Sequence, residues 1–504
     1  MIKRISLLLV VLLTLASCAS TLNGKYQKVK LQTGSASAKV YVDDDYVGKG
    51  KTVTAKLKRD YGVRQFRIEN EGYKSTYSVG YQTLKSPLYI LSWIPFGILV
   101  YPALLDIGPK SFNYRKELVI KQGEKINQKD AAGKYIYLKN ASVNVKKEDL
   151  RIEMFTKSRY EKNKASKNVT RSDKEISVDN SIFSDVLEDI LKEYKYYDTT
   201  NSIFKTKTNT LYLSATITKI TGKAIQLRGI RSYMVTDVFI DWEVLDFYQQ
   251  PKLKVSVRGT SGEFAISSGE GQKVFLNSVE DAITGSFLKM LADPKVKPLL
   301  STDKESKVTH AGLSIAKPVN SVASLSQAQN ATVTIVTKNG HGSGCAISPD
   351  GYIVTAYHVV AGNETVEIIT NDGTKAKAKF VRANEETDVA LIKTDLKFDI
   401  PYTIPAVKGY EVGQDVFAVG TPTNIELGQT LSKGIISGIR KQTSVELIQT
   451  DVSVNRGNSG GALVDGKGNL IGIVNSKMIG FGVEGISFNV PANTLSELLS
   501  LKYE

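Results

Sequence analysis

Short runs of alternating apolar and polar residues dominate the front of the chain. Between residues 35 and 79, β-branched and aromatic residues alternate with polar ones, and Asp43, Asp44, Asp45 and several glycines interrupt the alternation. Period-two alternation broken by turn-forming residues is typical of short antiparallel strands. The pattern predicts a small β-domain, which we place at residues 35–120.

An uncharged apolar segment at residues 86–105 lies inside this domain. It is long enough to cross a bilayer, but Pro87, Pro95 and Pro102 would interrupt a helix where lipid offers no replacement hydrogen-bond partner. We therefore expect a buried or interfacial hairpin, for which Trp93 is suited because aromatic rings favour the membrane interface. A membrane span is the alternative.

The middle of the chain, residues 121–293, combines helical and strand-like patterns. Apolar residues recur at helical spacing at residues 179–194 and 274–291. Between them, strand-like runs occur at residues 210–220, 234–247 and 253–259. This order predicts a compact α+β domain, and no motif assigns it a function.

The composition changes after residue 293. Residues 294–330 are rich in Lys, Ser, Thr and Pro, which predicts a linker. At residues 331–504, short Val- and Ile-rich runs with frequent glycine predict an all-β domain. The predicted fold class is therefore multidomain, with a small β-domain, an α+β domain and a C-terminal all-β domain in that order.

The first eighteen residues have the pattern of an export signal. Two positive residues precede an apolar run at residues 5–16 that is too short for a membrane span. The run ends in Leu15-Ala16-Ser17-Cys18, which resembles the lipobox of bacterial lipoproteins. The resemblance implies a signal peptide at residues 1–17, a lipid on Cys18 and a tether at residues 18–34.

Lipidation of Cys18 sets the expected location. Because Ala19 is not an aspartate, the resemblance implies no retention at the inner membrane. We expect an outer-membrane lipoprotein of the bacterial cell envelope that faces the periplasm, and an ordinary signal peptide with a chance cysteine is the alternative. The other cysteine, Cys345, follows Gly344 in an apolar pattern and is expected to be buried, so no intramolecular disulfide is predicted.

Charge is distributed unevenly along the chain. The formal net charge is +15, yet residues 324–504 hold 15 Lys and Arg against 18 Asp and Glu, so the positive excess lies in front of residue 324. On a lipid-anchored protein, a basic front predicts attraction to anionic lipid or acidic envelope polymers. An ordinarily solvated surface is the alternative. An exported chain without a recognition motif is not expected to bind nucleic acid.

Three short motifs in the N-terminal β-domain carry a family resemblance. Val40-Tyr41-Val42-Asp43, Tyr46-Val47-Gly48 and Glu71-Gly72-Tyr73 resemble the PEGA repeat, a small sandwich found in surface and envelope proteins. The resemblance implies a docking module and names no ligand.

A candidate nucleophile lies in the C-terminal domain. Acyl transfer from a peptide requires a nucleophile, a base, a group that fixes the tautomer of the base, and donors for the oxyanion. In Gly457-Asn458-Ser459-Gly460-Gly461, small residues allow a tight loop that a substrate carbonyl can approach. We predict Ser459 as the nucleophile and the N–H groups of Gly457 and Ser459 as oxyanion donors. Taken alone, this segment could be a simple tight turn.

The candidate base is found by elimination among three histidines. His310 falls in the predicted linker, and His341 precedes a predicted turn and is expected at the surface. An apolar strand leads directly into His358, which makes it the candidate general base. Asp388 leads another apolar strand, and because a buried carboxylate is costly without hydrogen bonds, it is the candidate partner of His358.

Together these segments resemble the HtrA-type branch of the trypsin-like serine proteases over residues 331–500. The motifs are Gly342-Ser343-Gly344, Thr355-Ala356-Tyr357-His358, Asp388-Val389-Ala390-Leu391 and residues 455–463. The order His, Asp, Ser is that of the chymotrypsin architecture. The resemblance implies two six-stranded antiparallel barrels, the first carrying His358 and Asp388 and the second carrying Ser459. It also implies a closing helix at residues 491–501.

The same resemblance outlines a substrate cleft. The strand that contains Val474, Asn475 and Ser476 is expected to pair with an extended peptide. Ser453 stands where proteases selective for Arg or Lys carry an acid, so cleavage after basic residues is not expected. The remaining predicted pocket residues are Val454, Ile486 and Phe488, which imply a small apolar pocket and cleavage after small or medium aliphatic residues.

The expected function is that of a lipid-anchored envelope serine endopeptidase that acts on unfolded or envelope proteins without a metal or cofactor. HtrA-type proteins carry PDZ domains after the protease domain, and none is expected in this chain. The alternative is an envelope-binding lipoprotein whose protease-like domain is an inactive scaffold. No oligomeric state and no natural substrate are predicted.

Overall fold

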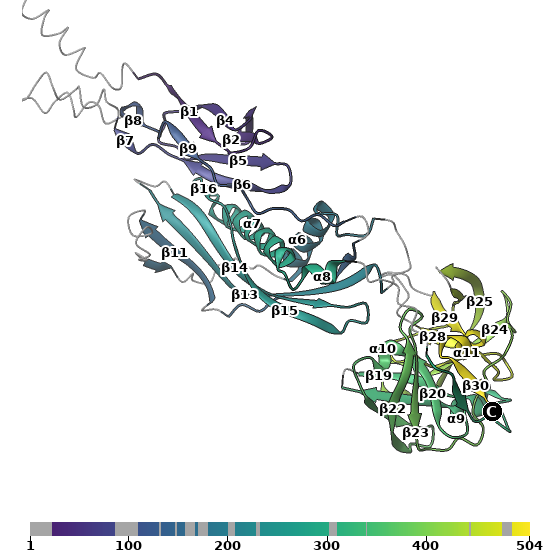
Figure 1. Cartoon of the computed structure of the whole chain (residues 1–504). Coiled ribbons are helices and arrows are strands. Elements are labelled where there is room, and N and C mark those ends of the chain that lie inside the picture. Colours follow the sequence, from purple (N-terminus) through teal and green to yellow (C-terminus); the bar gives the residue numbers. More distant parts are fainter. Residues whose placement is uncertain are drawn as a thin grey trace, which may run out of the picture.

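The chain was analysed as a computed structural model, in which three folded parts follow one another (Figure 1). The predicted signal peptide, Cys18 and the apolar segment at residues 86–105 lie outside the described residues. Within the described ranges, no helix is both long enough and apolar enough to span a membrane. The structure describes residues 23–85, 109–130, 133–146, 149–156, 167–169, 180–199, 207–227, 232–301, 310–338, 340–442, 445–475 and 486–504.

Two sheets packed around a common core form the N-terminal part. Alternate side chains along the strands point inward, and Leu31, Leu57 and Phe66 are among those that are buried. A short pair, β7 with β8, lies beside them. The first sheet contains β1 (Tyr26–Gln32), β4 (Thr52–Lys58) and β9 (Glu117–Val119); the second contains β2 (Lys39–Val42), β3 (Asp45–Lys49), β5 (Arg64–Asn70) and β6 (Tyr73–Gly80); the short pair is β7 (Leu84–Lys85) and β8 (Phe112–Asn113).

Strand β1 corrects the predicted tether at residues 18–34. Tyr26–Gln32 pair with β4 along their whole length. Val29 and Leu31 are buried, whereas Lys28 and Lys30 between and beside them are exposed. This alternation is a strand signal that the tether prediction overlooked.

A seven-stranded sheet forms the middle part, and helices α6 (Asn180–Glu193) and α7 (Gly271–Ala292) cover one of its faces (Figure 1). Both helices and strands β13 to β15 occur where helical and strand-like patterns are found, whereas β10 to β12 have no counterpart in the prediction. The strands are β10 (Tyr135–Val143), β11 (Leu150–Thr156), β12 (Lys167–Val169), β13 (Thr210–Gln226), β14 (Ser232–Leu245), β15 (Pro251–Thr260) and β16 (Phe264–Ile266).

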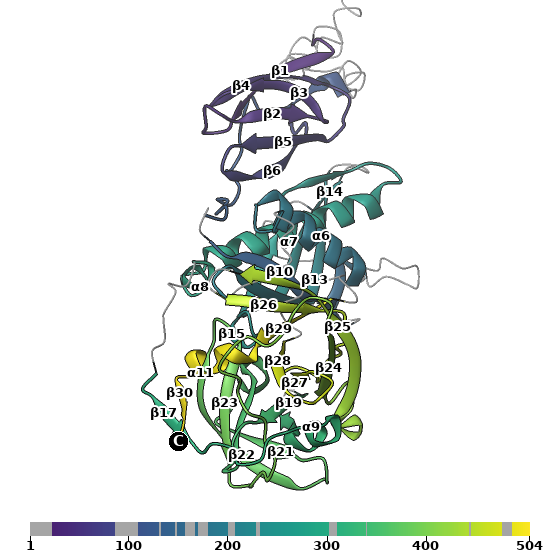
Figure 2. The ribbon, with the colours of Figure 1, turned by 90° about the vertical axis from the view of Figure 1, so that its right-hand side faces the viewer.

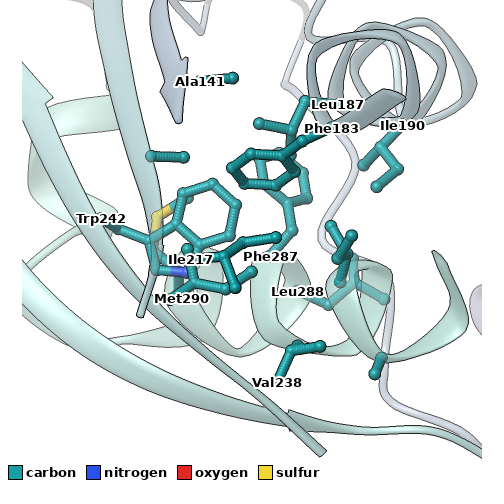
Figure 3. Close-up of a cluster of buried hydrophobic side chains, with 14 of the residues drawn as sticks. Ala141, Phe183, Leu187, Ile190, Ile217, Val238, Trp242, Phe287, Leu288 and Met290 are labelled. Atoms are coloured by element: carbon teal, nitrogen blue, oxygen red, sulfur yellow. The ribbon is translucent and has the colours of Figure 1, made fainter. Parts of the chain in front are cut away.

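Trp242 of β14 lies at the centre of the middle core and is fully buried. Its ring packs edge-on against Phe287 of α7, with the ring centroids 5.8 Å apart. Its indole N–H donates a hydrogen bond to Ser286 Oγ at 3.0 Å. Figure 3 shows Phe183 and Leu187 of α6 gathered around the same two rings. Both helices and the sheet therefore share one core, in which each large side chain contributes about 2 kcal/mol of burial energy.

Buried polar contacts join the N-terminal part to the middle part. Lys74 of β6 forms an ion pair with Asp281 of α7 at 2.7 Å, and both side chains are less than a tenth exposed. The Glu263 carboxylate accepts hydrogen bonds from Ser78 Oγ and from the N–H of Val79, each at 3.0 Å. Removing one partner of a buried ion pair typically costs about 3–5 kcal/mol. The two parts are therefore specifically docked.

Two closed barrels of six strands each form the C-terminal part, which confirms the predicted pair of barrels (Figure 2). The first contains β18 (Thr332–Thr337), β19 (Gly340–Ala346), β20 (Tyr352–Ala356), β21 (Thr365–Ile369), β22 (Lys375–Asn384) and β23 (Val389–Thr394). The second contains β24 (Asp415–Gly420), β25 (Thr430–Gln442), β26 (Val445–Thr450), β27 (Ala462–Val464), β28 (Leu470–Asn475) and β29 (Ser487–Pro491).

The predicted linker at residues 294–330 contains ordered elements: α8 (Lys297–Leu300), β17 (Leu313–Ile315) and α9 (Leu325–Ala331). Strand β17 pairs in parallel with β30 (Leu501–Tyr503) at the other end of the domain, so no local pattern reveals it. The predicted closing helix at residues 491–501 is shorter than expected, because only η5 (Ala492–Thr494) and α11 (Leu495–Leu498) are helical before β30 begins.

Candidate active site

Strand register brings His358 and Asp388 together. Strand β20 pairs antiparallel with β23 so that Ala356 faces Val389. Just beyond this pair, the N–H of Tyr357 donates to the carbonyl of Asp388 at 3.0 Å. His358 is the next residue, in the short helix α10 (Tyr357–Val360). The imidazole and the carboxylate therefore emerge from adjacent strand ends.

The Asp388 carboxylate makes two hydrogen-bond contacts with His358. One oxygen accepts the main-chain N–H of His358 at 2.8 Å, and the other lies 2.5 Å from His358 Nδ1. The Asp388 side chain is 1% exposed and that of His358 is 10% exposed. A carboxylate bound to Nδ1 fixes the tautomer in which Nε2 is free of its proton and can accept one. This is the arrangement that a general base requires.

Ser459 lies in a loop that is tied to both barrels. Its carbonyl accepts the N–H of Ser343 from the first barrel at 2.8 Å. In the second barrel, Gly460 N–H donates to Val474 O at 2.8 Å, and Val474 N–H donates to Gly461 O at 2.9 Å. These bonds place Ser459 at the junction of the two barrels.

Gly342 shows how closely the Ser459 loop approaches the helix that carries His358. A Cβ built on Gly342 would lie 2.6 Å from the side chain of Val359 and 3.2 Å from the carbonyl of Ser459. Only a residue without a side chain fits this gap. The main chain at Ser459 therefore lies close to the short helix that carries His358.

Gly460 is required by both its conformation and its surroundings. Its φ is +83°, and a Cβ there would lie 2.2 Å from both Ser343 O and Thr355 Oγ1. Left-handed φ is unfavourable for residues with a Cβ. The glycine after Ser459 is thus a structural necessity of the loop.

The segment before Ser459 forms a type II turn. Asn458 N–H donates to Asn455 O at 3.1 Å, and Gly457 at the third position has a φ of +100°, whereas Arg456 is not in the left-handed region. The Arg456 carbonyl accepts the N–H of Thr423 at 2.7 Å. Because N–H and C=O point in opposite directions across a trans peptide, the Gly457 N–H points away from Thr423.

Residues of the first barrel support this turn. Ser343, which is fully buried, donates through Oγ to Gly457 O at 2.8 Å and accepts the N–H of Thr421 at 3.0 Å.

The prediction that His341 is a surface residue is wrong. His341 is half-buried, and its Nε2 lies 3.0 Å from Thr421 O. A Cβ on Gly457 would lie 2.4 Å from that nitrogen, so His341 packs directly against the turn.

The predicted cleft residues are only partly brought together. Val474 uses both main-chain groups to bind Gly460 and Gly461, which corrects its predicted role in pairing with a peptide. Asn475 is buried and follows it at the end of β28, and Ser476 lies outside the described residues. A peptide strand would therefore have to pair beyond Val474.

The residues of the predicted specificity pocket belong to two different parts of the core, and the pocket itself stays a prediction. Ser453 is exposed and Val454 is half-buried against the cluster that contains Val474. Phe488 is 1% exposed and, with Ile486, belongs to a different core cluster. Phe488 and Val454 therefore pack in different core clusters.

Cys345 is fully buried beneath the Ser459 loop, with its sulfur 3.5 Å from Gly460 O. Burial raises the pKa of its thiol well above the usual value, so it remains a neutral packing residue. In the described ranges, no cluster of three or more His, Cys, Asp or Glu residues could hold a metal ion.

Comparison with known proteins agrees with this geometry. Residues 342–473 match the protein family described as "Trypsin-like peptidase domain". A "Serine protease Do-like HtrA" of Lactococcus lactis subsp. cremoris is 35% identical over 168 residues, which cover 30% of this chain and 41% of that protein. A "Probable periplasmic serine endoprotease DegP-like" of Halomonas elongata is 39% identical over 163 residues, which cover 31% of this chain and 34% of that protein.

A solved structure is also similar to part of the chain. The "HtrA-type protease AlgW with tripeptide" is 35% identical, with a TM-score of 0.31, and the match covers 35% of this chain and 62% of that one. The family match and the two closed barrels define the C-terminal part of the chain as a trypsin-like peptidase domain. More particularly, it is a trypsin-like serine protease domain of the HtrA type, which confirms the predicted resemblance. The chain spans 41% of the length of its Lactococcus relative.

Proposed function

We propose that the chain is a serine endopeptidase in which Ser459 is the nucleophile, His358 the general base and Asp388 the residue that orients His358. The observation that carries this proposal is the double attachment of His358 to a buried Asp388, beside the loop that presents Ser459. The similarity to HtrA-type serine proteases supports the same chemistry.

In the proposed reaction, His358 takes the proton of Ser459 Oγ while that oxygen bonds to the carbonyl carbon of the substrate. The carbonyl electron pair moves to the oxygen and returns when the amine leaves, and the amine takes its proton from His358. Water then loses a proton to His358 and attacks the ester on Ser459. The acid leaves when the bond to Ser459 Oγ breaks, and His358 returns the proton to that oxygen. Asp388 orients His358 and stabilises the protonated imidazole.

We propose the N–H groups of Gly457 and Ser459 as donors to the oxyanion. The type II turn directs the Gly457 N–H away from Thr423, and the bond from Thr423 N–H to Arg456 O, which belongs to the same peptide, holds this orientation. Flipping the peptide would place a carbonyl where a donor is needed, and loss of one such donor typically costs about 3 kcal/mol of barrier. The turn therefore supports an oxyanion site that is formed before substrate binds.

We propose protein or peptide substrates without a basic residue before the cleaved bond, because the exposed residue at position 453 is a serine.

For the whole chain we propose a lipid-anchored protein of the bacterial envelope, facing the periplasm from the outer membrane. The lipobox-like Leu15-Ala16-Ser17-Cys18 and the periplasmic location in the name of the Halomonas relative support this. The basic front of the chain is suited to anionic lipid or polymer.

The hydrolysis of a fluorescently labelled, unfolded protein by the wild type and by Ser459→Ala tests the proposed activity. We expect the variant to lose nearly all turnover while keeping its fold. Equal rates would refute the proposed triad and favour an inactive scaffold.

The proposed lipid anchor is tested by Cys18→Ala. This variant is expected to move the protein from membranes to the soluble fraction, and retention on membranes would overturn the proposed lipidation.

A further inference from the structure

The turn between β14 and β15 carries a contact from the middle part to the protease domain. The hairpin points toward the first barrel in Figure 1. Asp246 accepts the N–H of Gln249 at 2.8 Å and, through its carboxylate, the N–H of Gln250 at 2.9 Å. Lys252 Nζ lies 2.8 Å from the same carboxylate. A turn with this many internal bonds presents its remaining side chains in a fixed direction.

Tyr248 in this turn is almost completely buried, at 3% exposure. Its ring packs edge-on against Tyr357 of the first barrel, with the centroids 4.8 Å apart and the planes at 87°. Its hydroxyl donates a hydrogen bond to the main-chain oxygen of Glu385. Lys207, which precedes β13, adds an ion pair with the Glu385 carboxylate. The middle part thus contacts two separate segments of the protease domain.

Both contacted segments adjoin the proposed catalytic pair. Tyr357 immediately precedes His358, and its N–H is bonded to Asp388 O. The Glu385 carbonyl that accepts the Tyr248 hydroxyl also faces the N–H of Asp388, at 3.4 Å. This distance is long for such a bond, so the main chain holds the turn at residues 385–388 only weakly.

The conformation of Asp388 adds to the need for outside support. Its φ is +56°, in the left-handed region that is unfavourable for a residue with a Cβ. Residues in such conformations persist when the surrounding structure holds them there. Tyr248 supplies packing and a hydrogen bond at this point.

We propose that Tyr248 is a positioning residue for the reaction, which holds Tyr357 and the turn at residues 385–388 so that Asp388 keeps its bonds to His358. The proposal rests on the proposed endopeptidase function. Burial, with the charges of Asp388 and Glu385, raises the pKa of Tyr248 far above its usual range, so its hydroxyl remains a donor. The middle domain thereby contributes a residue that supports the proposed catalytic pair.

Kinetics of full-length variants test this role. Misplacing a catalytic group by a small distance can cost about 100-fold in rate, so Tyr248→Ala is expected to lower kcat by about 10- to 100-fold with little change in KM. Tyr248→Phe keeps the ring and loses the hydroxyl, and one hydrogen bond corresponds to about a two- to tenfold loss. Tyr197→Ala, which removes a 40% exposed tyrosine from the same domain, is the matched control and is expected to match the wild type.

A second readout does not depend on turnover. In the Ser459→Ala background, the proton between His358 Nδ1 and Asp388 should give a far-downfield proton NMR resonance because the bond is short. Adding Tyr248→Ala is expected to remove or broaden this resonance. If the parent shows the resonance but no hydrolysis by wild type is found, the proposed function fails while the positioning role is still measured.

Two results would overturn the proposal that Tyr248 is a positioning residue. If kcat and the downfield resonance are the same in Tyr248→Ala as in the parent, or if only KM changes, Tyr248 does not position the pair. Circular dichroism and thermal unfolding check that the variants are folded. Should Tyr248→Ala fail to fold, Tyr248→Phe decides the question, because it keeps the contacts of the ring with Tyr357.

Discussion

Asp388 binds His358 through both carboxylate oxygens, one at 2.8 Å from the main-chain N–H and one at 2.5 Å from Nδ1. Because β20 and β23 are paired up to Ala356 and Val389, sheet register brings the two residues to adjacent strand ends. The turn that carries Asp388 is the part that we propose Tyr248 supports.

Asp388→Asn tests the value of that orientation. An asparagine keeps the size of the side chain but can donate to Nδ1, which favours the wrong imidazole tautomer. We expect kcat to fall by about 10⁴-fold with the fold intact. Steady-state kinetics measure the effect, with Asp415→Asn as the control because Asp415 forms only an exposed ion pair with Lys433. A loss of less than tenfold would contradict the assigned role.

Gly460→Ala is expected to destabilise the protease domain by more than about 2 kcal/mol, because the alanine would combine a left-handed φ with a steric clash. The added Cβ would meet Ser343 O and Thr355 Oγ1 at 2.2 Å. Gly466→Ala is the matched control, since no atom lies within 4 Å of its Cβ position. Urea denaturation of both variants measures the difference, and equal midpoints would show that the loop can relax.

The carboxylate of Asp237 in β14 is expected to stabilise the middle domain in a pH-dependent way. It contacts Lys223 at 2.6 Å and Arg258 at 2.9 Å, and Thr260 donates to it at 2.7 Å. Burial alone would raise the pKa of Asp237, but these partners outweigh burial and lower it. Its stabilising effect is therefore present above the unfolded pKa of about 4 and is lost as pH falls through the lower folded value.

Asp237→Asn should lower the free energy of unfolding by about 2 kcal/mol near neutral pH, and the difference from wild type should shrink below about pH 4. Urea unfolding followed by the fluorescence of the buried Trp242 measures both effects. Asp241→Asn on the same strand is the control, because Asp241 accepts a bond from Ser256 near the surface. A difference that grows on acidification would reverse the predicted sign.

Cys345 is expected to be unreactive in the folded protein. Its thiol is buried and its pKa is raised by burial, so neither access nor the thiolate form is available. In the Cys18→Ala protein, a thiol reagent such as Ellman's reagent should react only after denaturation. Rapid reaction of the native protein would mean that the Ser459 loop above Cys345 opens readily.

The triad candidates could be predicted because each lies in a short local motif. Glycines around Ser459 and apolar strands leading to His358 and from Asp388 are visible without any long-range information. Elements with strong periodicity, such as α7 and β14, were predictable for the same reason.

Other elements depend on contacts that local patterns do not contain. In β10, only Ile136 and Ala141 are buried, so its alternation is too weak to reveal a strand. Strand β17 exists because β30 pairs with it. The contact of Tyr248 with Tyr357 joins two domains, and only the folded chain brings these residues together.

The central claim, that Ser459 is an activated nucleophile, is tested most directly by covalent labelling with a fluorophosphonate and mass spectrometry of the digested protein. The proposed triad predicts one adduct, on the peptide that contains Ser459, which is absent from Ser459→Ala and forms much more slowly in Asp388→Asn. No adduct on the folded wild type, or an adduct that persists in Ser459→Ala, would contradict it.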